Sequence, residues 1–196
     1  MSRQLDRRDA VRALLERRGD LLVVAGLGSS AWDCTAAGDH PLTFPLWGAM
    51  GSACTIGLGL ALAQPKRRVL VVTGDGEMLM GLGSLATVAV QRPANFAVVV
   101  LDNERYGETG MQKTHTAYGT DLAGVAAACG FATAEIIRSE ARLAAVRADI
   151  HRRKGPLFYQ VKVASDPVPL CLPPRDGALL KHRFREALLG ERAASQ

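Results

Sequence analysis

The chain has 196 residues, of which 48% are hydrophobic and 22% are charged, as expected for one globular α/β domain with a buried core. No apolar run approaches the roughly 20 residues of a membrane-spanning helix. The charged first residues lack the apolar segment of a signal peptide, so we expect a cytoplasmic protein with no membrane partner. The net charge of +5 comes from scattered arginines and from Arg152-Arg153-Lys154. Because no aromatic residues are interleaved with these charges, we expect no nucleic-acid partner.

The cysteines are far apart in the sequence and form no Cys-x-x-Cys pair, so neither a zinc site nor an iron–sulfur cluster is indicated. We expect most of them to be small buried apolar side chains. They are Cys34, Cys54, Cys129 and Cys171.

Apolar residues at helical spacing predict a first helix over residues 6–18, and the apolar run after it predicts a buried strand over residues 21–25. Gly26–Ala31 then match the Gly-x-Gly-x-x-Ala pattern of dinucleotide-binding domains. That fingerprint needs a second strand ending in an acid about twenty residues later, whereas residues 41–50 contain prolines and no acid. We therefore favour a loop in which Ser29 or Ser30 caps a short helix, with dinucleotide binding as the alternative.

A helix rich in Gly and Ala is expected over residues 52–63. Two apolar, β-branched runs follow, beginning at Val69 and at Phe96, with a helix expected over residues 79–90 between them. Such runs are typical of buried parallel strands, and their spacing fits one βαβ unit. The fold class predicted is α/β, with a three-layer, doubly wound, mainly parallel sheet.

Each of these two strands ends in a small polar cluster, Gly74-Asp75-Gly76 after the first and Asp102-Asn103 after the second. Ligands gather outside the carboxyl ends of parallel strands, so Asp75 and Asn103 should face one crevice. Their oxygens suit Mg²⁺, the glycines let the backbone approach a ligand closely, and the amides of the following helix would face an anion. The sequence therefore predicts a metal-diphosphate site.

This combination resembles the thiamine diphosphate enzymes, whose signature is Gly-Asp-Gly followed some twenty-five to thirty residues later by Asn. The resemblance implies that Asp75, Asn103 and the backbone carbonyl of Arg105 bind Mg²⁺, and that Gly74 and Gly76 contact the diphosphate. The family often has Ser where Glu77 stands. We expect the backbone of Glu77 to serve the site, while its side chain points towards a neighbour or solvent.

The resemblance extends upstream to Gly48-Ala-Met-Gly51. It implies that the Gly48 carbonyl holds the 4′-amino group of the cofactor's aminopyrimidine. Met50 would be the wedge that bends thiamine into its V shape, although ordinary core packing is the alternative for a methionine.

The polar, Gly-rich stretch over residues 104–116 is expected to form a functional loop over the cofactor. It includes Tyr106 and Gly107 as further cofactor contacts. His115 is the candidate catalytic residue, because His is the usual proton carrier near neutral pH. The candidates for substrate contact are Glu108, Thr109, Lys113 and His115.

In the remaining chain we expect helices over residues 121–129, 139–153 and 176–189, an edge strand over 131–137 and a last strand over 157–163. The prediction is thus one domain over residues 1–196, in which 164–196 form an irregular, proline-containing segment and a C-terminal helix.

Full-length thiamine diphosphate decarboxylases carry a second domain, which binds the aminopyrimidine and supplies an activating Glu; no room remains for one here. The chain therefore resembles one subunit of a split enzyme, similar to the sulfopyruvate and phosphonopyruvate decarboxylases. Residues 48–51, 74–76, 83–87, 102–103 and 106–107 carry this resemblance. It implies decarboxylation of a small anionic 2-oxo acid with thiamine diphosphate and Mg²⁺. It also implies a separate aminopyrimidine-binding partner subunit, in an α₂β₂ assembly or a multiple of it.

Two alternatives remain open. A carboligase would add the same cofactor-bound carbanion to an aldehyde, and a non-catalytic module would keep the cofactor site for assembly or regulation. The 2-oxoacid:ferredoxin oxidoreductases, which usually have cluster cysteines, and the lipoamide-linked dehydrogenases fit the sequence less well.

Overall fold

The computed structural model describes residues 4–194 and contains a six-stranded, fully parallel sheet with the strand order β2-β1-β3-β4-β8-β7. A short antiparallel hairpin, β5–β6, follows β4. The strands are β1 Leu22–Ala25, β2 Thr43–Pro45, β3 Val69–Gly74, β4 Phe96–Asp102, β5 Arg105–Tyr106, β6 Gln112–Lys113, β7 Thr133–Ile137 and β8 Leu157–Lys162.

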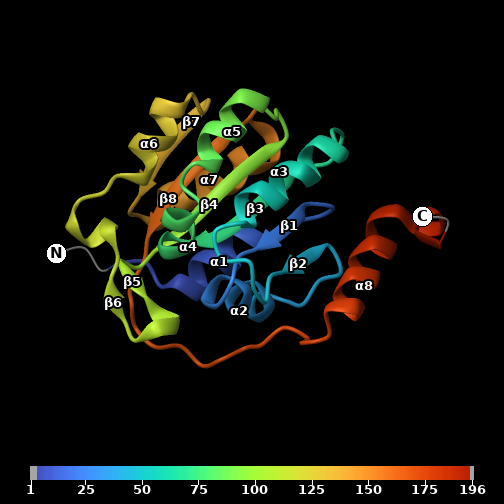
Figure 1. Ribbon diagram of the computed structural model, residues 1–196, viewed down its shortest axis with the longest axis horizontal. Coiled ribbons are helices and arrows are strands. Elements are labelled where there is room, and N and C mark those ends of the chain that lie inside the picture. The colour runs from blue at the N-terminus through green and yellow to red at the C-terminus, as the bar shows by residue number, and fades with distance from the viewer. Residues whose placement is uncertain (1–3, 195–196) are drawn as a thin grey trace.

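Helices cover both faces of this sheet, which confirms the predicted three-layer α/β architecture (Figure 1). The α-helices are α1 Arg7–Leu15, α2 Ser29–Ala36, α3 Ala53–Ala63, α4 Asp75–Met80, α5 Ser84–Gln91, α6 Leu122–Cys129, α7 Glu140–Arg152 and α8 Gly177–Leu189. The 3₁₀ helices are η1 Gly107–Thr109, η2 His115–Tyr118 and η3 Gly190–Ala194. None of the helices in residues 4–194 combines the length and the apolar character needed to cross a bilayer.

The strands are buried on both faces, which is why they appear in the sequence as continuous apolar runs. Alternate residues divide between two cores: Val72 and Val99 face the side of α1 and α7, and Val71 and Val98 face the side of α3, α5 and α6. A Cβ on Gly57 of α3 would lie 2.2 Å from the Val71 side chain. The small residues of α3 therefore let this helix lie directly on the sheet.

The structure differs from the predicted elements first around β2. Residues 43–45 form an edge strand parallel to β1, although prolines at 41 and 45 had argued against a strand. An edge strand tolerates proline because one side of its backbone needs no ladder partner. Nor does Ser29 or Ser30 cap α2, since Gly28 holds the N-cap position at φ 73° and no side chain caps the helix.

The second difference is the helix predicted over residues 79–90, which is two helices. The first, α4, begins at Asp75 itself and ends at Met80, and α5 begins at Ser84. A Cβ on Gly81 would lie 2.0 Å from the carbonyl oxygen of Gly51. The chain therefore turns here against the loop before α3.

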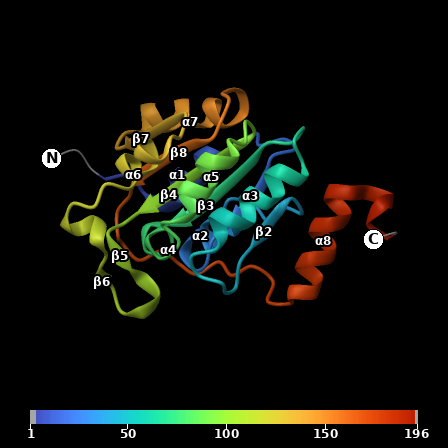
Figure 2. The same ribbon diagram turned by 45° about the horizontal axis from the view of Figure 1, so that its top comes forward.

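After β8 the chain passes irregularly to α8, which packs beside the edge strand β2 at the far end of the sheet from the β5–β6 hairpin (Figures 1 and 2). The ring centroids of Phe184 and Phe44 lie 5.5 Å apart. Arg183 donates to both carboxylate oxygens of Asp39, at 2.6 and 2.9 Å. The C-terminal helix is thus held by this chain's own sheet. Residues 1–3 and 195–196 of the predicted domain lie outside the described residues.

Candidate functional site

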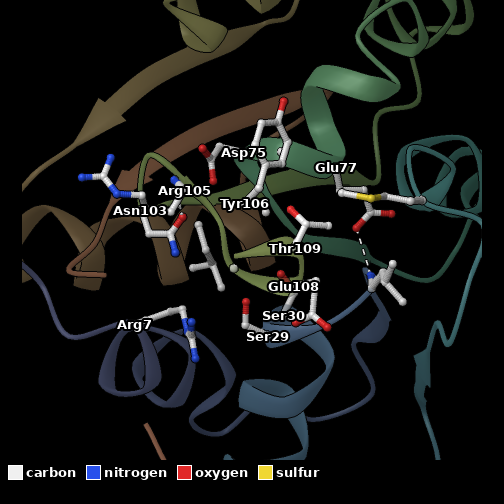
Figure 3. A pocket seen from close by; sticks show the side chains of 16 residues that line it. Arg7, Ser29, Ser30, Asp75, Glu77, Asn103, Arg105, Tyr106, Glu108 and Thr109 are labelled. Atoms are coloured by element: carbon white, nitrogen blue, oxygen red, sulfur yellow. Dashed lines mark hydrogen bonds between the residues drawn. The ribbon is translucent and has the colours of Figure 1, made fainter. Parts of the chain in front are cut away.

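A cleft lies where the carboxyl ends of β1, β3 and β4 meet, at the edge where the sequence predicted a site (Figure 3). Most of its walls come from the turns after these strands and from the β5–β6 hairpin. The lining residues are Arg7, Leu27, Ser29, Ser30, Met50, Gly74, Asp75, Gly76, Glu77, Leu101, Asn103, Arg105, Tyr106, Gly107, Glu108 and Thr109.

Asp75 is the first residue of α4 and is only 1% exposed. Its Oδ2 accepts hydrogen bonds from the hydroxyls of Thr114, at 2.6 Å, and Thr116, at 3.2 Å. Burial raises the pKa of the Asp75 carboxyl to about 6, and the two threonine hydrogen bonds oppose that rise. Within residues 4–194 no Lys, Arg or His forms an ion pair with Asp75, and no side chain donates to its Oδ1. The cleft therefore contains a buried carboxylate that lacks a cation.

The neighbouring acid, Asp102, has a cationic partner in Lys162, which it shares with Glu104. It is fully buried, and its Oδ2 lies 2.9 Å from Nζ of Lys162. Its Oδ1 accepts from the hydroxyl of Thr116 at 2.8 Å, so Thr116 links it to Asp75. Asp102 therefore orders the end of β4 with a cation beside it, whereas Asp75 has no such partner among the described residues.

Asn103 follows β4 and directs the chain into the hairpin. Its Oδ1 accepts the backbone N–H of Arg105 at 3.0 Å, a local turn typical of Asn. An amide oxygen has a second lone pair, so this hydrogen bond leaves it able to bind a cation.

This donor set fits Mg²⁺ held jointly with a phosphate. It offers one carboxylate, one amide oxygen and the Arg105 carbonyl. No group of three or more His, Cys, Asp or Glu in the described part of the chain could hold a metal. Mg²⁺ is usually bound by one or two carboxylates together with phosphate oxygens and water, so such a group is not required.

Gly76 has a packing role that the sequence did not predict. A Cβ there would lie 2.7 Å from the ring of Tyr106, so the ring covers the start of α4. Gly74 has more space, since only the Ser30 hydroxyl lies within 4.0 Å of such a Cβ.

Of the two directions expected for the Glu77 side chain, a neighbour or solvent, it takes the first and contacts neighbouring residues of this chain. It is 4% exposed, and its Oε2 accepts from the Leu27 backbone N–H at 3.0 Å and from the Thr73 hydroxyl at 2.8 Å. Burial raises the pKa of its carboxyl, and these hydrogen bonds oppose the rise. Oε1 is buried and makes no hydrogen bond to the described residues. Glu77 therefore joins the turn after β3 to the turn after β1.

Met50 lines the cleft and is 36% exposed. It lies in a tight loop in which Ala49 and Gly51 have φ of 57° and 93°. The Trp47 indole N–H donates to the Pro174 carbonyl at 2.8 Å on the other side of this loop. Gly48 is exposed and does not line the cleft within this chain.

Two candidates from the loop over residues 104–116 are not brought to the site. His115 and Lys113 are exposed and do not line the cleft, and Lys113 lies over the Tyr118 ring instead. The residues beside His115, Thr114 and Thr116, are the ones that reach Asp75. Their alternation with an exposed residue was a signal that sequence reasoning missed.

The sequence interpretation also assigned no site role to Ser29, Ser30 or Arg7, which line the cleft. The serines begin α2, so their place at the end of β1 was a usable signal. Arg7 reaches the cleft only because α1 packs beside α2 (Figure 3), and nothing local in the sequence indicates this.

The fold and the cleft define a cofactor-binding domain, and comparison with known proteins identifies its family. Residues 28–161 match the family model described as thiamine pyrophosphate enzyme, C-terminal TPP binding domain. The chain therefore belongs to this family, and the resemblance predicted from Gly74–Gly76 and Asn103 is confirmed.

Individual relatives within this family are named as decarboxylases. The chain is 32% identical to the sulfopyruvate decarboxylase subunit beta of Methanococcus maripaludis, over 94% of this chain and 98% of that subunit. It is 48% identical to the phosphonopyruvate decarboxylase of Streptomyces viridochromogenes, over 61% of this chain and 30% of that enzyme. Matches to two other subunits named sulfopyruvate decarboxylase subunit beta span 66% and 68% of them.

A solved structure shares the fold. Benzoylformate decarboxylase from Polynucleobacter necessarius superposes with a TM-score of 0.70 at 19% identity, over 85% of this chain and 34% of that one. The chain thus corresponds to about a third of that longer protein.

Proposed function

We propose that the chain is the diphosphate-binding subunit of a thiamine diphosphate- and Mg²⁺-dependent decarboxylase of a small anionic 2-oxo acid. The observation that carries the proposal is Asp75, a buried carboxylate without a cationic partner in residues 4–194. It shares a cleft with Asn103 at the ends of adjacent strands. The names of the relatives, which act on sulfopyruvate and phosphonopyruvate, support the substrate class.

In this proposal Asp75, Asn103 and the Arg105 carbonyl hold Mg²⁺. The backbone of residues 74–77, with Tyr106 and Gly107, lies along the diphosphate. When bound, the cofactor supplies a thiazolium ring that accepts the electron pair released as CO₂ leaves. The protein's part is to orient that ring. Met50 would do so at the cleft wall, with the Gly48 carbonyl fixing the aminopyrimidine.

We infer that a second chain completes the site, because apolar side chains beside the cleft remain exposed in this one. Trp47 and Met50 beside it are 40% and 36% exposed, and Met80 at the end of α4 is 61% exposed. Exposed apolar side chains gathered at a cleft usually mark an interface. We infer an aminopyrimidine-binding partner subunit that also supplies the activating carboxylate, in a closed α₂β₂ assembly or a multiple of it.

The test is to assay CO₂ release from sulfopyruvate, phosphonopyruvate and pyruvate, with Mg²⁺ and thiamine diphosphate. The chain alone should be inactive, and adding the partner subunit should restore turnover with one of the anionic substrates. Sustained turnover by the isolated chain would overturn the two-subunit arrangement. Product formation only when an aldehyde is added would favour the carboligase alternative.

A further inference from the structure

We propose that Arg7, on the first helix, binds the terminal phosphate of the cofactor's diphosphate. This inference rests on the proposed function and adds a phosphate ligand from α1, which lies outside the family-matched residues 28–161.

Arg7 is placed at the diphosphate end of the cleft. It lines the cleft together with Ser29, Ser30 and Asn103. In Figure 3 its guanidinium projects from α1 towards Ser29, on the side of the cleft where Asn103 lies and away from Glu77. A phosphate held near Asp75 and Asn103 would therefore have Arg7 beside its outer oxygens.

The guanidinium of Arg7 is oriented in advance. Its Nε donates to Oδ2 of Asp33, a fully buried residue of α2, and its Nη2 lies 3.5 Å from Oδ1. The Arg7 side chain is 12% exposed, so little rotational freedom remains to be lost when a ligand binds. Nη1 donates to no residue among those described, which leaves it available to an anion.

Arg7 and Arg8 together carry one more positive charge than the carboxylate of Asp33 can balance. The Nε of Arg8 also lies 3.3 Å from Oδ1 of Asp33, so one carboxylate is shared by two guanidinium groups. The remaining positive charge matches a diphosphate, which one Mg²⁺ does not fully neutralise. A planar guanidinium also binds phosphate oxygens in a directed, charge-assisted way.

Arg8 supplies a matched control. It shares Asp33 with Arg7 and is similarly buried, at 16% exposed. However, it does not line the cleft, and its Nη2 donates to the Pro169 carbonyl at 2.7 Å. Replacing either arginine removes one guanidinium from Asp33, but only Arg7→Gln removes one from the cleft.

The experiment is isothermal titration of the full chain assembled with its partner subunit, with Mg²⁺ present, by thiamine diphosphate and by thiamine monophosphate. Arg7→Gln should weaken diphosphate binding on the order of ten- to a hundredfold, the range for losing one hydrogen bond to a charged group. Monophosphate binding should change little, because that ligand lacks the terminal phosphate. Arg7→Lys should fall between wild type and Arg7→Gln, and Arg8→Gln should keep the wild-type ratio of the two affinities.

The possible outcomes separate this inference from the proposed function. If wild type does not bind thiamine diphosphate, both are overturned. If wild type binds and Arg7→Gln binds equally well, this inference alone fails. It also fails if Arg7→Gln raises only the KM for the 2-oxo acid and leaves cofactor binding unchanged. An equal change of the affinity ratio in Arg8→Gln would show that the effect passes through Asp33, and would also overturn a direct contact.

Discussion

The Glu77 carboxylate accepts a hydrogen bond from the backbone N–H of Leu27 at 3.0 Å, although the two residues are 50 positions apart in the chain. The contact requires glycine at position 26, because a Cβ there would lie 2.0 Å from Oε2 of Glu77. The turns after β1 and β3 border the same cleft. They are therefore a single hydrogen-bonded unit, and disturbing one disturbs the other.

Two substitutions of Glu77 should distinguish the contribution of its acceptor oxygen to stability from the contribution of its charge. Glu77→Gln retains an oxygen that can accept the Leu27 N–H, whereas Glu77→Ala leaves this N–H unsatisfied. We expect the Ala variant to be less stable than the Gln variant by about 1–3 kcal/mol in urea unfolding. At the exposed Glu186, the same two substitutions should differ by less than about 0.5 kcal/mol. Equal stability of the two Glu77 variants would contradict the role of the hydrogen bond.

Gly81 and Gly83 lie two residues apart and should respond differently to alanine. A Cβ at Gly81 meets the Gly51 carbonyl, whereas one at Gly83 has nothing within 4 Å. Gly81→Ala should lower the free energy of unfolding by about 1–3 kcal/mol, since a backbone contact cannot easily move aside. Gly83→Ala should stay within about 0.5 kcal/mol of wild type. A similar loss in both variants would show that helix propensity, and not the contact, sets the cost.

Met50→Ala should reduce turnover more than it weakens binding of thiamine diphosphate. The diphosphate would still be held by the Asp75 region, while the wall that bends the cofactor would be lost. Steady-state kinetics with the partner subunit and titration calorimetry measure the two effects. Leu179→Ala, at an exposed position on α8 and outside the cleft lining, controls for loss of apolar surface. Unchanged kcat in Met50→Ala would rule out the wedge.

Asp75→Asn should stabilise the metal-free chain while abolishing Mg²⁺-dependent cofactor binding. The folded-state pKa of about 6 lies above the ordinary value of 3.8. The ionised carboxylate therefore opposes folding, fully above pH 6 and not at all below about pH 4. In EDTA at pH 8 the variant should melt at a higher temperature than wild type. Asn103→Ala should lose the same binding without that gain. Retained Mg²⁺-dependent affinity in both variants would refute the metal assignment.

The cysteines should react in two groups with a thiol reagent. Burial raises the pKa of Cys34 to about 12 and that of Cys54 to about 11, so at pH 8 almost no thiolate forms at either. Cys129 and Cys171 are only partly buried. At pH 8 these two should react first, and Cys34 and Cys54 only after the chain unfolds. Rapid reaction of all four in the native chain would contradict the packing around α2 and α3.

Much of the fold could be predicted because its signals are local. The strands starting at Val69 and Phe96 are buried on both faces, so they appear as uninterrupted apolar runs. Asp121 caps α6 and Gly130 ends it in the left-handed conformation, and the helix predicted over residues 121–129 depended on these local signals. The break between α4 and α5 was not predictable in this way, because it depends on contact with Gly51, which is distant in sequence.

Some residues of the candidate site could be predicted from the sequence and others could not. Asp75 and Asn103 could be expected to share a cleft, since neighbouring parallel strands end at the same edge. Arg7 could not be placed there, because its position depends on the packing of α1 against α2. The partner of Glu77, the Leu27 N–H, could not be identified from the sequence, because it belongs to a different turn.

The packing of α8 against β2 makes the two edges of the sheet unequal. At one edge β2 is only three residues long and ends at Pro45, which has no N–H, and α8 lies beside it. At the other edge β7 is five residues long, and its Ile136 is 39% exposed. Unpaired edge strands are templates for joining other chains. When the protein is concentrated or refolded, unwanted strand addition should therefore begin at β7, where the Glu135–Arg142 ion pair is the nearby charged obstacle.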